Sequence, residues 1–151
     1  MCYRKGYECL LAGLPVEQLS RLQRVQNCAA RLISKKRKSA HITPVLRELH
    51  WLPVKHRWQF KIGVLVFRYF EGTLPSYLSN TLQLYQPSRS LHSSTEKLLR
   101  IPRRKMKSVG ERSFSFLTPT VWNSLPSFVR SRSDLVSFKS ALKTHFFNQA
   151  Y

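Results

Sequence analysis

The fold is decided by the stretch PVKHRWQFKIGVLVFRYFEG, residues 53–72. Pro53 suits the start of a helix, where its missing N–H is not needed, and Gly72 suits the end. The stretch is apolar around most of a helical wheel, and a narrow stripe carries these basic side chains: Arg57, Lys61 and Arg68. A helix that is apolar nearly all round is buried by its neighbours. The stretch therefore predicts the central buried helix of a small, mainly α-helical domain.

The flanking sequence predicts one helical domain over residues 15–151, preceded by a weakly ordered segment over residues 1–14. Short helices are expected to pack around the central one, because their apolar residues recur at helical spacing. One short strand or hairpin is expected near residues 97–102, where Pro102 would end it. It would lie in an exposed basic loop around residues 86–110, which is rich in Ser.

The cleanest amphipathic helix is predicted from Leu19 to about Lys36. We expect its core side to consist of the apolar residues that share one face: Leu19, Leu22, Val25, Ala29, Leu32 and Ile33. The opposite face is cationic: Arg21, Arg24, Arg31 and Lys35, with Lys38 continuing it. No acid occurs between Ser20 and Ile42, whereas a face that only keeps a protein soluble usually intersperses Glu. The pattern favours phosphate contact over an ordinary solvated face.

The C-terminal third predicts two further features. Pro119 is expected to break or kink the helical stretch that begins near Glu111, with Thr118 capping a second short helix through Trp122. Ser133 or Asp134 is expected to cap a last helix that runs to about Asn148. The apolar residues of that helix share one face: Leu135, Phe138, Leu142 and Phe146.

Charge is the strongest global property of the chain. Lys and Arg outnumber Asp and Glu by 26 to 7, which gives a net charge of +19. A field of that sign attracts phosphate backbones or anionic lipid heads. We favour RNA or DNA over a membrane, because no long amphipathic segment has an apolar face free of a role in the core. The longest charge-free run of the central helix, residues 62–67, is too short to span a bilayer.

The cysteines predict a reducing compartment. An odd number of them without C-x-x-C spacing supports neither a disulfide framework nor a zinc module: Cys2, Cys9 and Cys28. No signal-peptide pattern is present, so we expect an intracellular protein that is not secreted. The run at residues 35–38 matches a short nuclear-import signal. It also lies where helix ends favour cations, which is the alternative interpretation.

The sequence offers no constellation for catalysis. Two-metal nucleotidyl transfer needs clustered carboxylates, but Asp134 is the only Asp and the Glu residues are scattered. We interpret His41, His50 and His56 as structural, because their spacing matches no metal module. No catalytic site, metal, cofactor or small-molecule substrate is therefore expected. The helix cations named above and a second basic cluster are the candidate nucleic-acid-binding residues, the second cluster being Arg103, Arg104, Lys105 and Lys107.

Several short blocks occur in an order that resembles non-LTR retrotransposon polyproteins. The first is LQRVQNCAARLI at residues 22–33, followed by HITPVL at 41–46 and LHWLPV at 49–54. The later blocks are LPSYL at 74–78, PSRSL at 87–91, GERSF at 110–114, WNSLP at 122–126 and SFK at 137–139. The resemblance covers roughly the whole chain from Leu10. So many blocks in order are more specific than any single short motif.

The resemblance implies a role rather than an activity. In that family the segment follows the palm and thumb of a reverse transcriptase, so the chain would be a nucleic-acid-handling tail of an RNA-directed DNA polymerase. The paired aspartates of the polymerase are missing, and residues 1–9 depart from the family's approach to the LLAGLP block at 10–15. This predicts a truncated copy. The alternative is a structural segment that packs on the polymerase region of the parent polyprotein and has no independent activity.

Overall fold

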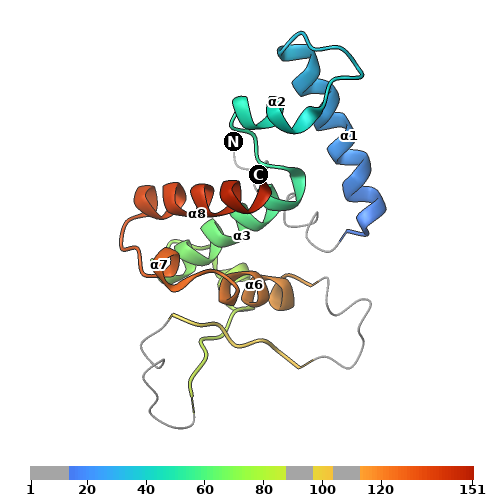
Figure 1. The fold of residues 1–151 in the computed structure, drawn as a ribbon. Coiled ribbons are helices and arrows are strands. Elements are labelled where there is room, and N and C mark those ends of the chain that lie inside the picture. The colour runs from blue at the N-terminus through green and yellow to red at the C-terminus, as the bar shows by residue number, and fades with distance from the viewer. Residues whose placement is uncertain (1–13, 88–96, 104–112) are drawn as a thin grey trace.

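The computed structural model describes residues 14–87, 97–103 and 113–151, and the structural statements below concern these residues. The chain is mainly α-helical, as predicted (Figure 1). The helices are α1 (Val16–Ile33), α2 (Ile42–Glu48), α3 (Val54–Phe70), α4 (Ser76–Ser79), α6 (Phe114–Asn123), α7 (Ser127–Arg130) and α8 (Leu135–Ala150). Among these helices, none is both long and apolar enough to cross a membrane.

The central position of α3 is confirmed. The helix starts directly after Pro53 and contacts α1, α6 and α8, and α8 and α6 lie on either side of it in Figure 1. It ends at Phe70, and Gly72 follows two residues later with a φ of +69°, in the left-handed region that glycine adopts easily. The N–H of Thr73 then donates to the carbonyl of Arg68 at 3.0 Å, which closes a Schellman turn.

The main core lies where α3 meets α6 and α8. The ring centroids of Phe67 and Phe138 are 4.6 Å apart, and the indole of Trp122 packs beside them. The helices approach closely because Gly63 lacks a side chain: a Cβ there would lie 2.8 Å from Cδ2 of Leu142. The buried members of this cluster include Ile62, Val66, Phe67, Val121, Trp122, Leu125, Phe138, Leu142 and Phe146.

The start and the core face of α8 are both confirmed. The side chain of Asp134 accepts a hydrogen bond of 2.8 Å from the N–H of Ser137, which satisfies one of the donors left over in the first turn. Phe138, Leu142 and Phe146 are buried. The spacing of these residues by four places them on one side of the helix, against α3.

Of the two outcomes predicted at Pro119, a break or a kink, the break was wrong, because α6 continues through it from Phe114 to Asn123. A proline inside a helix removes one backbone hydrogen bond and normally interrupts it. Here the ring of Pro119 is itself buried, together with Thr118 and Trp122 of the same helix. Tertiary packing thus stabilises a conformation that local preference disfavours. The expected start near Glu111 lies outside the described residues.

The extended segment near residues 97–102 forms one antiparallel bridge rather than a strand of a sheet. Leu99 pairs with Leu84, and the N–H of Arg100 donates to the carbonyl of Gln83 at 2.8 Å. Asn123 of α6 binds both backbone groups of Leu99, accepting from the N–H at 3.0 Å and donating to the carbonyl at 2.8 Å. These bonds attach the segment to the helical body.

The predicted core face of α1 was wrong. The exposed fractions are 38% for Leu22, 68% for Val25, 80% for Leu32 and 59% for Ile33. The side that faces the protein instead carries Gln23, Gln26 and Ala30, with only 8% of Gln26 exposed. The apolar stripe of α1 is therefore mostly in solvent.

Two glutamines explain this orientation. The N–H of Val54 donates to Oε1 of Gln23, and Nε2 of Gln26 donates to the carbonyl of Leu52, each at 2.9 Å. Both backbone groups lie at the corner before α3, where regular structure leaves them without partners. Buried backbone groups need hydrogen bonds. The side of α1 that carries Gln23 and Gln26 therefore faces the corner.

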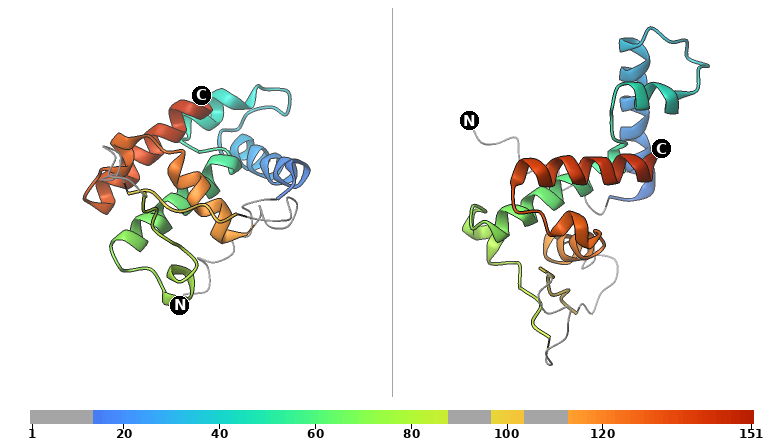
Figure 2. Two further views of the ribbon diagram at one scale, coloured as in Figure 1. Left: turned by 90° about the horizontal axis from the view of Figure 1, so that it is seen from below. Right: turned by 60° about the vertical axis from the view of Figure 1, so that its left-hand side comes forward.

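A second, smaller core joins α1 to α2. Ala30, Val45 and Leu46 are buried there, with Trp51 and Tyr151 packed against them. The hydroxyl of Tyr151 donates to the carbonyl of Trp51 at 2.6 Å. Figure 2 shows α1 and α2 rising from the body that α3, α6 and α8 form.

Candidate nucleic-acid interface

The cations of α1 and of the turn after it form the candidate interface. Arg21, Arg24, Lys35 and Lys38 are exposed. No side chain of the four has a hydrogen-bond or ion-pair partner in the described part of the chain. They face solvent because the glutamine side of the helix is turned toward the corner. Lys36 and Arg37 add two more exposed cations to the turn.

Arg31 differs from the other predicted contacts because the fold already uses it. Its Nη2 donates to the carbonyl of Ala40 at 3.3 Å, and its side chain is half-buried. The helix ends just beyond it, where Lys35 has a φ of +53° and the N–H of Lys36 donates to the carbonyl of Arg31 at 3.0 Å. Arg31 therefore holds the turn that carries Lys35 and Lys38.

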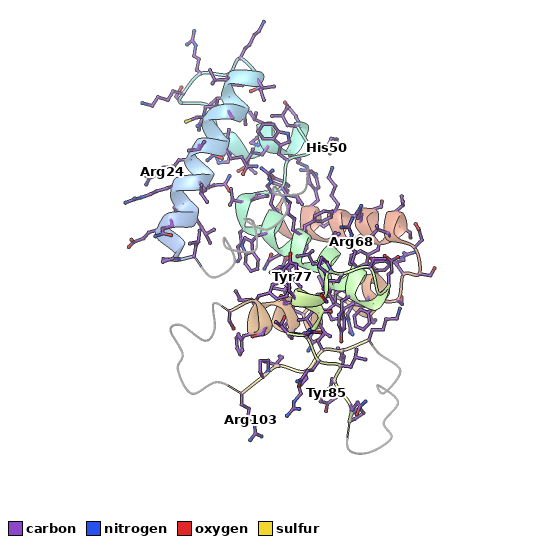
Figure 3. All side chains as sticks on the ribbon, turned by 180° about the vertical axis from the view of Figure 1, so that it is seen from behind. Arg24, His50, Arg68, Tyr77, Tyr85 and Arg103 are labelled. Atoms are coloured by element: carbon purple, nitrogen blue, oxygen red, sulfur yellow. The ribbon has the colours of Figure 1, made fainter. Side chains whose placement is uncertain are left out.

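The second predicted cluster lies elsewhere on the molecule. Arg103 is exposed, and Arg24 and Arg103 lie at opposite ends of the view in Figure 3. The other members, Arg104, Lys105 and Lys107, lie outside the described residues. The structure thus does not join Arg103 to the α1 cations in one surface.

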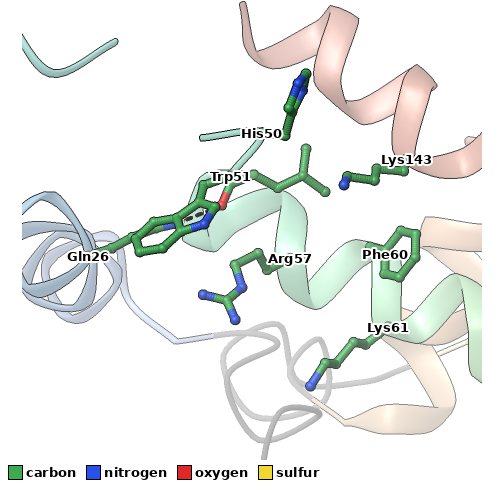
Figure 4. A pocket seen from close by; sticks show the side chains of 8 residues that line it. Gln26, His50, Trp51, Arg57, Phe60, Lys61 and Lys143 are labelled. Carbon is green, nitrogen blue, oxygen red and sulfur yellow. Dashed lines mark hydrogen bonds between the residues drawn. The ribbon is translucent and has the colours of Figure 1, made fainter. Parts of the chain in front are cut away.

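A basic cleft lies between α1, α3 and α8, and it was not predicted from the sequence. Its volume is about 660 Å³, and these residues line it: Gln26, His50, Trp51, Leu52, Arg57, Phe60, Lys61 and Lys143. Arg57 and Lys61 project from the same side of α3 (Figure 4). Their spacing of four on an otherwise apolar helix was the available signal. Lys143 comes from α8, and no pattern in the sequence connects it to α3.

Positive charge dominates the cleft, since Arg57, Lys61 and Lys143 line it and no acid is among its described lining residues. Partial burial lowers the pKa of Lys61 below its ordinary value, because a charged amine is less well solvated there. A nearby anion would oppose that shift. The cleft is therefore suited to a negatively charged ligand.

The exposed stripe of α1 borders a second, apolar groove. Its volume is about 370 Å³, and its lining includes Leu22, Val25, Val54 and Trp58. This groove removes the reason given above for favouring nucleic acid over a membrane surface, which required the apolar face of α1 to be buried. An anionic lipid surface therefore has to be included in any binding test.

His56 and Asp134 have structural surroundings. His56 is buried, and its Nδ1 lies 3.0 Å from Oε1 of Gln59. Burial lowers the pKa of His56, although the bond to Gln59 opposes the shift. Within the described ranges, no group of three or more His, Cys, Asp or Glu could hold a metal ion. Asp134 caps α8.

Comparison with known proteins leaves the chain without an assigned relative. No protein-family model matches it. Neither a curated protein nor a solved structure matches it. The function therefore has to be argued from the geometry above.

Proposed function

We propose that the chain is a non-catalytic nucleic-acid-binding module of a retroelement reverse transcriptase. The retroelement origin is supported by the ordered sequence blocks alone. The observation that supports nucleic-acid binding is the row of exposed cationic side chains on α1 and its turn, which have no partner in the described residues. Phosphate contacts of this kind are independent of base sequence. The net charge of +19 would add attraction at longer range.

Its non-catalytic character is supported by the place of its acids. Asp134 is the only Asp in the chain, and its carboxylate accepts from the N–H of Ser137 at the start of α8. A residue engaged in this way is poorly placed to hold a catalytic metal, which needs several oxygen ligands at one point. The proposed module would hold the template or product for chemistry performed elsewhere.

The test is the salt dependence of binding. Each phosphate contact contributes about 0.7 to 0.9 to the slope of log affinity against log salt. The triple variant Arg21→Gln, Arg24→Gln, Lys38→Gln should therefore flatten the slope by about 2 to 3. Fluorescence anisotropy with a labelled 20-mer, titrated at several salt concentrations, measures this change. Binding should be similar for unrelated base sequences.

The control removes the same charge away from α1, through Lys55→Gln, Arg132→Gln and Lys139→Gln. It should leave the slope nearly unchanged, because these cations lie outside the proposed interface. Equal flattening by both variants would show that only net charge matters and would contradict the proposal. So would a preference of the wild-type chain for anionic lipid vesicles over nucleic acid at equal phosphate concentration.

A second candidate function is packing on a larger partner, and the exposed apolar stripe of α1 favours it. Val25 and Leu32 are mostly in solvent, and Val25 lines an apolar groove; apolar patches of this kind mark protein contacts. The chain would then be a structural segment of the parent polyprotein that binds its polymerase region.

This second candidate predicts self-association of the isolated chain. Sedimentation velocity should show oligomers, which the double variant Val25→Ser, Leu32→Ser converts to monomers. Adding the upstream polymerase region should replace the oligomers by a defined complex. A wild-type chain that stays monomeric at high concentration and ignores the polymerase region would exclude this role.

A further inference from the structure

The basic cleft combines the properties of a nucleotide site. Its volume of about 660 Å³ falls within the range of small-ligand pockets. Arg57, Lys61 and Lys143 supply positive charge, and no acid is among the described residues that line it. Trp51 and Phe60 are half-buried, so each retains an accessible apolar surface. Aromatic side chains of this kind stack on unpaired bases.

Gln26, one of the residues that line the cleft, has a polar atom without a partner in the described part of the chain. A carbonyl can only accept, so the bond from Gln26 to the carbonyl of Leu52 fixes the amide with its NH₂ toward Leu52. The remaining atom, Oε1, is buried and has no donor in the described part of the chain. An acceptor left unpaired in this way destabilises the fold unless another molecule supplies a donor. Nucleobase edges carry such N–H donors.

The position of the cleft relative to α1 favours a single strand over a duplex as the ligand. On the helical wheel, Gln26 lies opposite the exposed cations. A strand that contacts both must pass around a helix about 10–12 Å wide. A flexible single strand can do this over a few nucleotides, whereas duplex DNA is stiff over about 150 base pairs.

We propose that the cleft holds one unpaired nucleotide of a bound single strand, with the phosphate beside Arg57 and Lys143 and the base against Trp51 and Phe60. This inference rests on the proposed function, because α1 would hold the rest of the strand. It adds a preference for single strands over duplexes, which phosphate contacts along α1 alone do not provide. Base identity matters little, since stacking tolerates all four bases.

The experiment compares a 12-nucleotide strand, a fully abasic strand of equal length and a 12-base-pair duplex, by fluorescence anisotropy at one salt concentration. The wild-type chain should bind the strand with bases at least about five-fold more tightly than the abasic strand. The double variant Arg57→Gln, Lys143→Gln should lose about five-fold or more in single-strand affinity. Its duplex affinity should change less than about two-fold.

The matched control is Lys55→Gln, Lys139→Gln, which removes the same charge from the same two helices but does not line the cleft. It should change neither affinity by more than about two-fold. Equal wild-type binding of the strands with and without bases would overturn the inference, as would equal losses for strand and duplex in the cleft variant. Failure to bind any of the three probes would instead contradict the proposed function.

Discussion

Replacing Trp122 with alanine is expected to lower the free energy of unfolding by about 3–5 kcal/mol. Its side chain is fully buried, and its ring centroid lies 5.4 Å from that of Phe70 and 5.8 Å from that of Phe138. The indole N–H also donates to the carbonyl of Lys97. Alanine would leave a cavity between α3, α6 and α8 and remove one of the hydrogen bonds that attach the segment beginning at Lys97. Urea denaturation followed by circular dichroism measures the loss.

Phe128 provides the control for this prediction. It is also aromatic but is exposed, so Phe128→Ala should change stability by less than about 0.5 kcal/mol. Small domains are stable by only about 5–15 kcal/mol, so the Trp122 variant should lie close to unfolding. A loss below about 1 kcal/mol would mean that Trp122 is not at the centre of the core.

The second large effect is expected at the polar side of α1. Removing the side chain of Gln23 or of Gln26 should cost about 1–3 kcal/mol each. The reason is that the N–H of Val54 or the carbonyl of Leu52 would lose its hydrogen-bond partner at the partly buried corner before α3. Hydrogen exchange should show faster opening of α1 in the double variant Gln23→Ala, Gln26→Ala. The body formed by α3, α6 and α8 should stay protected.

The leucine and valine of the exposed stripe supply the contrast. Val25→Ala and Leu32→Ala should each stay within about 0.5 kcal/mol of the wild type, because both side chains are mostly in solvent. If the stripe were the core face that the sequence predicts, Leu32→Ala would cost about 2–5 kcal/mol instead. Comparing the stability lost by the glutamine variants with that lost by the Val25 and Leu32 variants therefore tests the orientation of α1 directly.

The orientation of α1 also shows what the sequence could not provide. Periodicity locates an apolar stripe, but it says nothing about the group on the other side of the contact. At α3 and α8 the stripe and the core coincide, because Phe67 and Phe138 meet each other. At α1 the neighbouring surface is a bent backbone with polar groups to satisfy. Hydrogen bonds to these backbone groups then determine which side of α1 faces the protein, and the aliphatic side chains stay exposed.

The same reasoning applies to the candidate site. The cations of α1 could be found from the sequence because they recur along one helix without acids between them. Arg31 could not be separated from them, since only the folded turn shows that it donates to the carbonyl of Ala40. The cleft needs Lys143 from α8 beside Arg57 from α3. Such a meeting of distant segments follows from tertiary packing, which local patterns do not encode.

The covering of α3 by α8 has a consequence for biosynthesis. Val66 and Phe67 are translated long before Phe138 and Leu142, which bury them. Until the later helix has left the ribosome, the nascent polypeptide exposes the apolar surface of α3 to the cell. Chains in that condition are prone to aggregate. We therefore expect production of this protein to depend on chaperones that hold the growing chain until its synthesis has passed α8.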